Sequence, residues 1–297
     1  MPFAASNPIV RPDVAVFERA LAELGWRKGS NIDIEYRWDA NKVDQIRALT
    51  RDLIAAQCEV IVSRSTFVTK TVLGEAKTVP IVFVQVSDPV GDGIVASMAR
   101  PGANVTGFTN IVASMSGKWV EFLKGVSPAI THVTMLYSPK TSPGRGGSYF
   151  LDSFEAAGRA FGLETRSVAI EEGLEIERAI KAAASPPGGA LIVAPSTSHA
   201  AHQELIITLA ARHRLPAIYP FTYWTDRGGL MSYGTDTADL FRRAASYIDR
   251  ILKGAKPADL PVQAPTKFLF TINRRAAIAT GLTIPRSLLA LADQVVD

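Results

Sequence analysis

Several polar and aromatic side chains of this chain fall where a predicted strand ends or a predicted helix begins, and their chemistry suits a small charged solute. Ser and Thr hydroxyls at a helix start can cap the helix and, with its free N–H groups, hold a carboxylate. Asp88 and Asp236 could pair with an ammonium group. The candidate hydroxyls are those of Ser65, Thr66, Ser196 and Thr197, and the aromatic side chains that could wall an apolar group are Phe221, Tyr223, Trp224 and Tyr233.

The stretch 79–110 carries the clearest version of this pattern. An apolar strand over 81–86 ends in Ser87 and Asp88, a short helix follows, and a second apolar strand ends in Asn110. In an open α/β sheet, ligands lie beyond the carboxyl ends of the strands. Two neighbouring strands that end in an acid, hydroxyls and an amide, without a nucleophile or a metal cluster, favour a binding cleft over a catalytic centre.

Each of these side chains also has a purely structural interpretation. Ser and Thr at helix starts usually act only as caps, and Asp236 could be the N-cap of a helix that begins near Ala238. Capping alone does not account for the whole set, however, because polar or aromatic side chains follow the predicted strand ends at Val62, Val86, Phe108, Ala194, Tyr219 and Tyr233. We therefore favour a shared cleft.

A metal site is not predicted. His199 and His202, with Glu204 nearby, could share one face of a helix, but a zinc site needs a third or fourth ligand. The segment is predicted to be an ordinary exposed helix start.

Catalysis and nucleotide binding are not predicted either. The Gly-rich segment 144–148 favours a flexible loop between lobes over a phosphate cradle, and the Ser-Gly-Lys at 116–118 lacks the upstream glycine of a P-loop. Cys58 is the only cysteine, so no intrachain disulfide can form, and it is predicted to be an inert core thiol. No nucleophile–base pair can be assembled, which predicts a protein that is not an enzyme and has no cofactor.

The composition bounds the class of protein. The 297 residues have a formal net charge of +4, and the basic residues are spread along the chain in short pairs such as Arg242-Arg243. Nucleic-acid binders concentrate their charge in a patch or stripe, so no nucleic-acid partner is predicted. The chain contains no run of 18 or more apolar residues of the kind that spans a membrane.

Strands and helices alternate along the chain in two series, which predicts an α/β fold of two Rossmann-like lobes with parallel sheets. Strand 32–36 is predicted at a sheet edge because its residues alternate between apolar and charged. The remaining predicted strands are 60–63, 81–86, the one ending at 109–110, 132–137, 164–168, 190–194, 217–219, 230–233 and 268–272, and the principal helices are 13–24, 43–56, 66–76, 115–124, 149–161, 175–184, 200–212 and 238–252.

The lobes are predicted to be discontinuous in sequence. The first takes 1–111 and about 236–262, and the second takes 112–235 and about 263–297. A Pro-rich connector begins near Gly254, and the tail after the last strand is predicted to form two short helices, 273–281 and 284–296.

The order of several short motifs resembles that of the substrate-binding proteins of bacterial ABC transporters with the type I periplasmic-binding fold. It is most similar to the branch that contains tryptophan- and tyrosine-binding lipoproteins, and the resemblance covers essentially the whole chain. The motifs are EYRW at 35–38, VPIVF at 79–83, SDPV at 87–90, PGANVTG at 101–107, LPAIY at 215–219, GLMSYG at 229–234, DLPVQ at 259–263, PTKF at 265–268 and GLTIP at 281–285.

The resemblance implies two lobes, joined by three crossover segments, that close on a small molecule held in the cleft between them. It implies a periplasmic location, an ABC permease in the membrane as partner, and a monomer. The site residues at positions that match the family's strand ends are Ser65, Thr66, Asp88, Asn110, Ser196, Phe221, Tyr233 and Asp236.

The ligand is expected to be an amino acid, possibly aromatic, or an analogue of one; branched-chain acids, purines and small aromatic acids remain alternatives. A bilobed ligand-sensing domain coupled to a signalling partner is the alternative function. The family opens with an export signal and a buried first strand, whereas residues 1–4 here match only the end of that strand. We therefore expect the natural reading frame to begin upstream.

Overall fold

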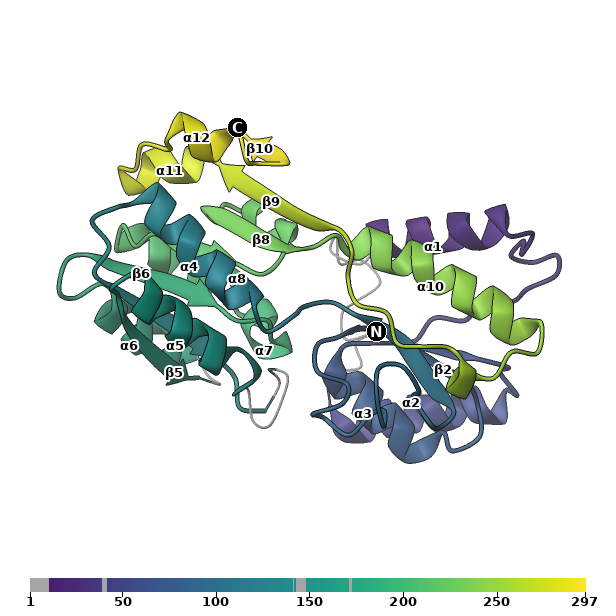
Figure 1. The fold of residues 1–297 in the computed structure, drawn as a ribbon. Helices are drawn as coiled ribbons and strands as arrows, with labels where there is room; N and C mark the ends of the chain where they lie inside the picture. The colour runs from purple at the N-terminus through teal and green to yellow at the C-terminus, as the bar shows by residue number, and fades with distance from the viewer. Residues whose placement is uncertain (1–10, 39–41, 141, 143–147, 171–172) are drawn as a thin grey trace. The chain divides into compact units, whose positions relative to one another are not determined.

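The computed structural model describes residues 11–38, 42–140, 142, 148–170 and 173–297. The chain divides into two compact units (Figure 1). Unit 1 comprises Met1–Ile111 and Asp236–Thr266, and unit 2 comprises Val112–Thr235 and Lys267–Asp297. Most of the Gly-rich segment 144–148 lies outside the described residues.

Unit 1 is built on a three-stranded parallel sheet in the order β1-β2-β3. The strands are β1 (Ile61–Arg64), β2 (Ile81–Val86) and β3 (Val105–Thr109). Every residue of β2 and β3 is buried, which explains why β2 appears in the sequence as an apolar run interrupted only by Gln85.

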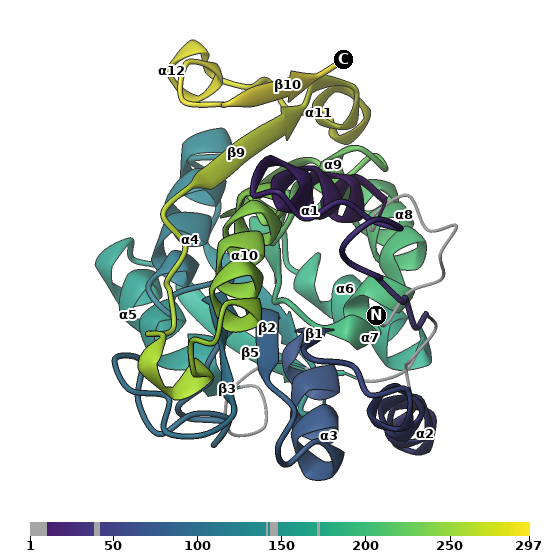
Figure 2. The same ribbon diagram turned by 90° about the vertical axis from the view of Figure 1, so that its right-hand side faces the viewer.

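Helices cover both faces of this sheet, because successive strand side chains point to opposite faces. Val82 and Val84 of β2 pack with helices α1 (Arg11–Glu23) and α10 (Thr237–Leu252). Ile81 and Phe83 pack instead with the cluster that contains helices α2 (Val43–Ala55) and α3 (Thr66–Glu75). Figure 2 shows the two helix layers of unit 1 on either side of its strands.

Unit 2 contains a seven-stranded sheet in the order β10-β9-β8-β7-β6-β4-β5. Its pairs are parallel except β8 with β9, which are antiparallel, with Thr235 opposite Phe268. After β8 the chain passes through the second segment of unit 1, Asp236–Thr266, and then re-enters unit 2 beside the C-terminal end of β8. Strand β9 therefore runs antiparallel to β8. The strands are β4 (His132–Tyr137), β5 (Glu164–Ala169), β6 (Gly189–Val193), β7 (Ala217–Tyr219), β8 (Met231–Thr235), β9 (Phe268–Asn273) and β10 (Gln294–Val296).

The remaining helices are short. The structure contains no helix, among the residues it describes, that is both long and apolar enough to cross a bilayer. The helices of unit 2 are α4 (Met115–Val126), η1 (Ser148–Phe150), α5 (Leu151–Ala160), α6 (Gly173–Ala183), α7 (Thr197–Ala201), α8 (Gln203–Arg212), α9 (Thr222–Thr225), α11 (Arg274–Thr280) and α12 (Arg286–Leu289), and unit 1 adds η2 (Pro257–Asp259).

The α/β class with parallel sheets is confirmed, but three local predictions are wrong. Residues 32–36 are not a strand, because no strand in the described part of the chain pairs with them. The short helix expected after Pro89 is a series of turns, where the Asp88 carboxylate accepts a hydrogen bond from the backbone N–H of Gly91 at 2.8 Å. The tail 284–296 forms α12 and then β10, which pairs with β9.

Candidate functional site

The carboxyl ends of β2 and β3 in unit 1 are joined by side chains. The Ser87 hydroxyl, which follows β2, donates a hydrogen bond to Oδ1 of Asn110, which follows β3, at 2.7 Å. Both residues are buried. The structure thus brings together the two strand ends of the stretch 79–110, and Asn110 is held by a neighbour from another strand.

Ser65 and Thr66 lie where β1 leads into α3. Ser65 is the N-cap of this helix, and its hydroxyl accepts a hydrogen bond from the Val68 N–H at 3.4 Å. The backbone of Ser65 has φ 77°, a left-handed conformation that is unfavourable for a residue with a Cβ and that often marks a functional position. Its own N–H donates to the Val84 carbonyl at 3.0 Å, which fixes the turn against β2.

The two predicted acids both take part in local backbone hydrogen bonds. Asp88 is half-buried and caps the turn at Gly91, as described above. Asp236 is the N-cap of α10, and its Oδ1 accepts a hydrogen bond from the Asp239 N–H at 3.2 Å. The capping interpretation of Asp236 is therefore correct.

The sequence prediction missed a buried polar cluster at the same end of unit 1. Nη1 of Arg64, the last residue of β1, lies 3.0 Å from Oδ2 of Asp13 on α1. Arg64 also donates from Nε to the side chain of Gln85 on β2 at 2.5 Å, and Thr237 on α10 donates to Oδ1 of Asp13 at 2.9 Å. The cluster thereby connects two strand ends with the N-termini of two helices. The signal in the sequence that could have indicated this cluster is Arg64, an arginine directly after the predicted strand 60–63.

Electrostatics within this cluster are dominated by burial. Asp13 and Arg64 are each 3 % exposed. Burial raises the pKa of the Asp13 carboxyl above its usual range, although the Arg64 guanidinium and the Thr237 hydroxyl both act to lower it. The guanidinium of Arg64 also lies over the Phe241 ring, 5.4 Å from its centroid.

In unit 2, Ser196 follows β6 and caps α7. Its hydroxyl accepts a hydrogen bond from the His199 N–H at 3.1 Å. The prediction of an exposed helix start is wrong for His199, which is 1 % exposed and lies with Nδ1 2.9 Å from the Ala194 carbonyl oxygen. Among the described residues, no three His, Cys, Asp or Glu side chains are grouped so that they could hold a metal ion.

Aromatic rings form a stacked series after β7, which we call the aromatic ladder: Tyr219, Trp224, Tyr223 and Phe221. Tyr219 and Trp224 stack with centroids 4.9 Å apart, Trp224 and Tyr223 with centroids 6.2 Å apart, and Tyr223 and Phe221 with centroids 5.6 Å apart. Tyr219 and Trp224 are fully buried, whereas Tyr223 is half-buried. Flat rings that are supported from behind offer a surface on which an aromatic group can stack.

Tyr233 lies apart from this ladder. Its ring packs against Phe122 of α4 and Phe268 of β9, with centroids 5.1 Å and 5.9 Å away. The preceding residue, Ser232, approaches Thr225 of α9 at 3.5 Å, so Tyr233 points to the opposite face of the sheet. Burial raises the pKa of its hydroxyl. The direction of the Tyr233 side chain could not be predicted from the sequence, because the sequence does not indicate which face of β8 packs against α4.

Gly234 is the next residue of β8, and it lies against the loop that begins the ladder. A Cβ placed there would lie 1.7 Å from the carbonyl oxygen of Pro220 and 3.7 Å from the Phe221 ring. Only glycine lets these backbones approach so closely. The position of Phe221 therefore depends on a glycine in the neighbouring strand.

Comparison with known proteins agrees with this architecture. The family model described as "ABC transporter substrate binding protein" matches residues 6–296. A protein of Clostridioides difficile called a tyrosine-binding protein is 22 % identical over 257 residues, which are 86 % of this chain and 73 % of the relative.

Two solved structures are similar over nearly the whole chain. An ABC domain from Streptococcus pneumonia in complex with L-Trp has a TM-score of 0.88 at 26 % identity, covering 99 % of this chain and 97 % of the other. A conserved domain protein from Vibrio cholerae has the same TM-score of 0.88 at 24 % identity, with coverages of 98 % and 96 %, and it supports the fold. The two-lobed α/β architecture, with its polar strand ends, and the match of the family model along the chain show that this protein belongs to the ABC transporter substrate-binding proteins.

Proposed function

We propose that this protein is the solute receptor of a bacterial ABC importer and that its solute is an amino acid with an aromatic side chain. The observation that carries the proposal is the aromatic ladder at the end of β7, in a chain of this family. The relatives support the same ligand class, since one is called tyrosine-binding and another was solved with L-Trp.

Each part of such a solute has a candidate partner. Ser65 and Thr66 would receive the carboxylate, because they lie at the N-terminus of α3, a helix of ten residues whose first N–H groups favour an anion. Ser196 is a second candidate, although α7 behind it has only five residues. Asp88 or Asp236 would pair with the ammonium group, with Asn110 as a further polar contact.

Phe221 and Tyr223 would receive the aromatic side chain. Tyr233, packed against α4, would support β8 rather than touch the solute. The proposed contacts come from both units, and a ligand shifts a conformational balance only through its different affinities for the two states. We therefore expect solute binding to favour a closed form by a hinge motion.

The proposal includes a location and a partner. A receptor of this family would act outside the cytoplasmic membrane as a monomer and deliver its small-molecule solute to an ABC permease. It would act without a cofactor and without nucleic acid.

A ligand panel tests the proposal. Thermal-shift and calorimetric titrations of the purified protein would compare L-tryptophan, L-tyrosine, L-phenylalanine, L-leucine and glucose. A solute at 100 times its dissociation constant stabilises the folded state by about 2.7 kcal/mol, which gives a clear rise in Tm. We expect the aromatic amino acids to raise the Tm most. A folded protein that responds to none of the amino acids, or to glucose alone, would contradict the proposal.

The panel can be extended to test the assignment of the charged groups. Tryptamine lacks the carboxylate of tryptophan, and indole-3-propionate lacks its amine. Loss of either charged partner leaves a buried group on the protein unpaired, so both analogues should bind at least about tenfold more weakly than L-tryptophan. Equal affinity for all three would remove the polar strand ends from the proposed site.

A further inference from the structure

Two residues at neighbouring positions of the sheet in unit 1 have a strained backbone. Ser65, which follows β1, has φ 77° and ψ 154°, a conformation that is essentially restricted to glycine. Gln85, in β2, has φ 62°. Arg64 is paired with Val84, so Ser65 and Gln85 occupy the next position of each strand. Strain of this kind persists only where the surrounding structure holds it, and it is concentrated at functional sites.

The strained Gln85 is a bulge in β2. The register of β2 with β3 shifts there by one residue, and Val86 lies opposite Thr109. The next residues along the two strands are Ser87 and Asn110, which form the hydrogen bond of 2.7 Å described above. Without the extra residue in β2, Ser87 would lie one position further along β3. The bulge therefore decides that these two candidate site residues meet.

The side chain of Arg64 holds this bulge. Its Nε donates a hydrogen bond to Oε1 of Gln85 at 2.5 Å, and both side chains are buried. Its Nη1 lies 3.0 Å from Oδ2 of Asp13, and the guanidinium also lies over the Phe241 ring. A guanidinium has a rigid, planar set of donors, so contacts in different directions fix its position. The amide of Gln85 is therefore bonded to a group that is itself fixed by two other contacts.

The same cluster extends to the start of α10. Thr237 donates a hydrogen bond to Oδ1 of Asp13 at 2.9 Å, and it directly follows Asp236, the N-cap of this helix. At the other end of the cluster, Arg64 directly precedes Ser65. The buried cluster therefore links backbone segments that carry candidate site residues, although its own members are not among those candidates.

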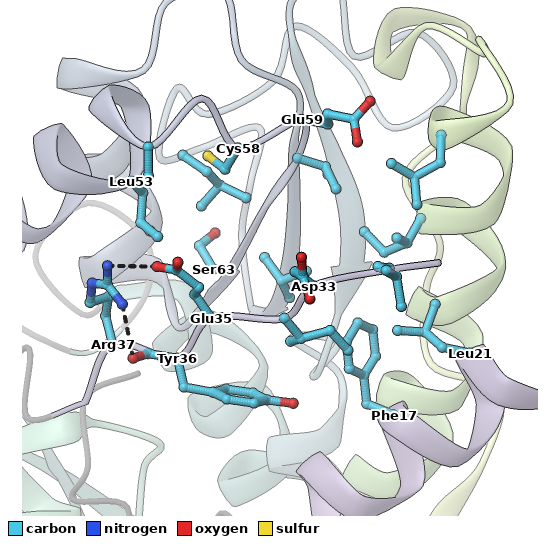
Figure 3. Close-up of a pocket in the computed structure, with 18 of the residues that line it drawn as sticks. Phe17, Leu21, Asp33, Glu35, Tyr36, Arg37, Leu53, Cys58, Glu59 and Ser63 are labelled. Carbon is cyan, nitrogen blue, oxygen red and sulfur yellow. Dashed lines mark hydrogen bonds and ion pairs between the residues drawn. The ribbon is translucent and has the colours of Figure 1, made fainter. Parts of the chain in front are cut away.

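Apolar packing between β1 and α1 is incomplete at this end of the strand. Unit 1 contains a cavity of about 550 Å³, and Figure 3 shows Ser63 of β1 and Phe17 of α1 among the side chains around it. Val14 of α1 also lines the cavity. Arg64 follows Ser63 and Asp13 precedes Val14. The ion pair therefore holds the end of β1 against α1 beside a cavity that leaves a gap in the side-chain packing.

We propose that Gln85 and Arg64 are positioning residues of the solute site. The hydrogen bond between their side chains holds the strained ends of β1 and β2, so that Ser65, Ser87 and Asn110 keep their binding arrangement in the free protein. This inference rests on the proposed function, because it concerns the same site. A protein whose binding arrangement is only partly populated binds its ligand more weakly in proportion, so preorganisation by these two residues raises the affinity.

A pair of glycine substitutions separates the side chain of Gln85 from its strained backbone. Gln85→Gly relieves the strain and removes the acceptor of the Arg64 hydrogen bond. Gln57→Gly is the matched control, because Gln57 is exposed and has φ 57°, so this substitution relieves similar strain away from the strand ends. We expect Gln57→Gly to raise the Tm and to leave the affinity for L-tryptophan unchanged. Gln85→Gly should weaken binding of L-tryptophan by at least about fivefold.

A second variant keeps the size of the side chain. Gln85→Met retains an unbranched side chain and the positive φ but removes the acceptor. It should weaken binding of L-tryptophan by about the same factor as Gln85→Gly. Calorimetric titration at a temperature well below the Tm of every variant measures the affinity of the folded protein, so a loss of stability alone would leave the dissociation constant unchanged.

Amide exchange measures the positioning without any solute. The N–H groups of Ser65 and Asn110 donate to β2 carbonyls on either side of the bulge, at 3.0 and 3.3 Å. Both should exchange at least about tenfold faster in the two Gln85 variants than in the native protein. Exchange at Ile81, at the other end of β2, should change much less, and Gln57→Gly should leave the rates at Ser65 and Asn110 unchanged.

The two measurements distinguish a failure of this inference from a failure of the proposed function. A native protein that binds none of the amino acids would contradict the proposed function, and the exchange rates would still decide whether Gln85 holds the strand ends. Unchanged exchange at Ser65 and Asn110 in both Gln85 variants would overturn the inference. A loss of affinity in Gln85→Gly but not in Gln85→Met would also overturn it, because the flexibility of glycine, rather than the lost bond to Arg64, would then be the cause.

Discussion

Arg64 and Asp13 form an ion pair inside unit 1, with Nη1 of the arginine 3.0 Å from Oδ2 of the aspartate. The pair joins the carboxyl end of β1 to the first turn of α1, and both side chains are buried. Removing two charges from water is costly, and the pair repays this only because each partner has further hydrogen bonds, to Gln85 and to Thr237.

The first prediction follows from this burial. Arg64→Met leaves the Asp13 carboxylate buried without its cation, and the free energy of unfolding should fall by about 3–5 kcal/mol. The double variant Arg64→Met with Asp13→Leu should recover most of this loss, because neither charge remains. Urea denaturation of the four proteins in the cycle measures both effects.

An exposed pair provides the control for this cycle. Lys118 and Glu121 lie 2.7 Å apart with side chains 51 % and 45 % exposed. Removing either charge should cost less than about 1 kcal/mol. Equal losses at the buried and the exposed pair would contradict the argument that burial makes the loss of one charged partner costly.

The second prediction separates the aromatic ladder from the other aromatic candidate. Phe221→Ala removes the ring at the end of the ladder, beside Tyr223, and should weaken binding of L-tryptophan by about tenfold, the value of a favourable aromatic contact. Tyr233→Leu, on the α4 side of the sheet, should leave the dissociation constant within about twofold and lower the stability instead. Calorimetric titration and thermal unfolding of both variants distinguish the two roles. A larger loss of affinity in Tyr233→Leu than in Phe221→Ala would reverse the assignment.

The third prediction uses two glycines of unit 2. Gly234→Ala forces a Cβ to within 1.7 Å of the Pro220 carbonyl oxygen, so β8 or the start of the ladder must shift. We expect a loss of about 1–3 kcal/mol in stability together with weaker binding of L-tryptophan. Gly117→Ala is the matched control: it lies within α4, its Cβ would meet only the Ala157 Cβ at 3.9 Å, and a helical alanine should stabilise by about 1 kcal/mol. Thermal unfolding should therefore show a lower Tm than that of the native protein for Gly234→Ala and a higher Tm for Gly117→Ala.

Local patterns in the sequence were sufficient for the fold because the core strands are buried on both faces. The apolar run of β2 is short and rich in β-branched residues, which predicts a buried strand, and the amphipathic pattern of α10 predicts its helix. The segment 32–36 failed as a strand because an alternating pattern becomes a strand only beside a neighbouring strand, and no strand of the described residues pairs with it. Strand β10 was missed because its three residues follow a helical pattern directly.

The candidate site was harder to predict because it depends on tertiary contacts. Hydroxyls and acids after strands could be located, but the contact of Arg64 with Asp13 joins distant parts of the sequence. The burial of His199 and the direction of Tyr233 likewise depend on which helix covers which face of a sheet. Residue types at strand ends therefore indicated where a site could form, and packing decided which side chains can take part in it.

The last prediction concerns Asp236, which has a structural role whether or not it binds a solute. Its Oδ1 caps α10 by accepting the Asp239 N–H. Asparagine caps a helix about as well as aspartate does, so Asp236→Asn should keep the Tm of the free protein nearly unchanged. If the carboxylate also pairs with the solute's ammonium group, the same variant should weaken binding of L-tryptophan by about 2–5 kcal/mol.

The analogue without an amine decides whether a loss of affinity comes from this pairing. Indole-3-propionate has no ammonium group, so its dissociation constant should be nearly the same for the native protein and for Asp236→Asn. Asp88→Asn, measured in parallel, tests the alternative partner, since Asp88 also has a local role at the Gly91 turn. A selective loss with L-tryptophan in only one of the two variants identifies the carboxylate that binds the amine. Unchanged L-tryptophan affinity in both would leave capping as the whole function of these acids and would require another group to bind the ammonium.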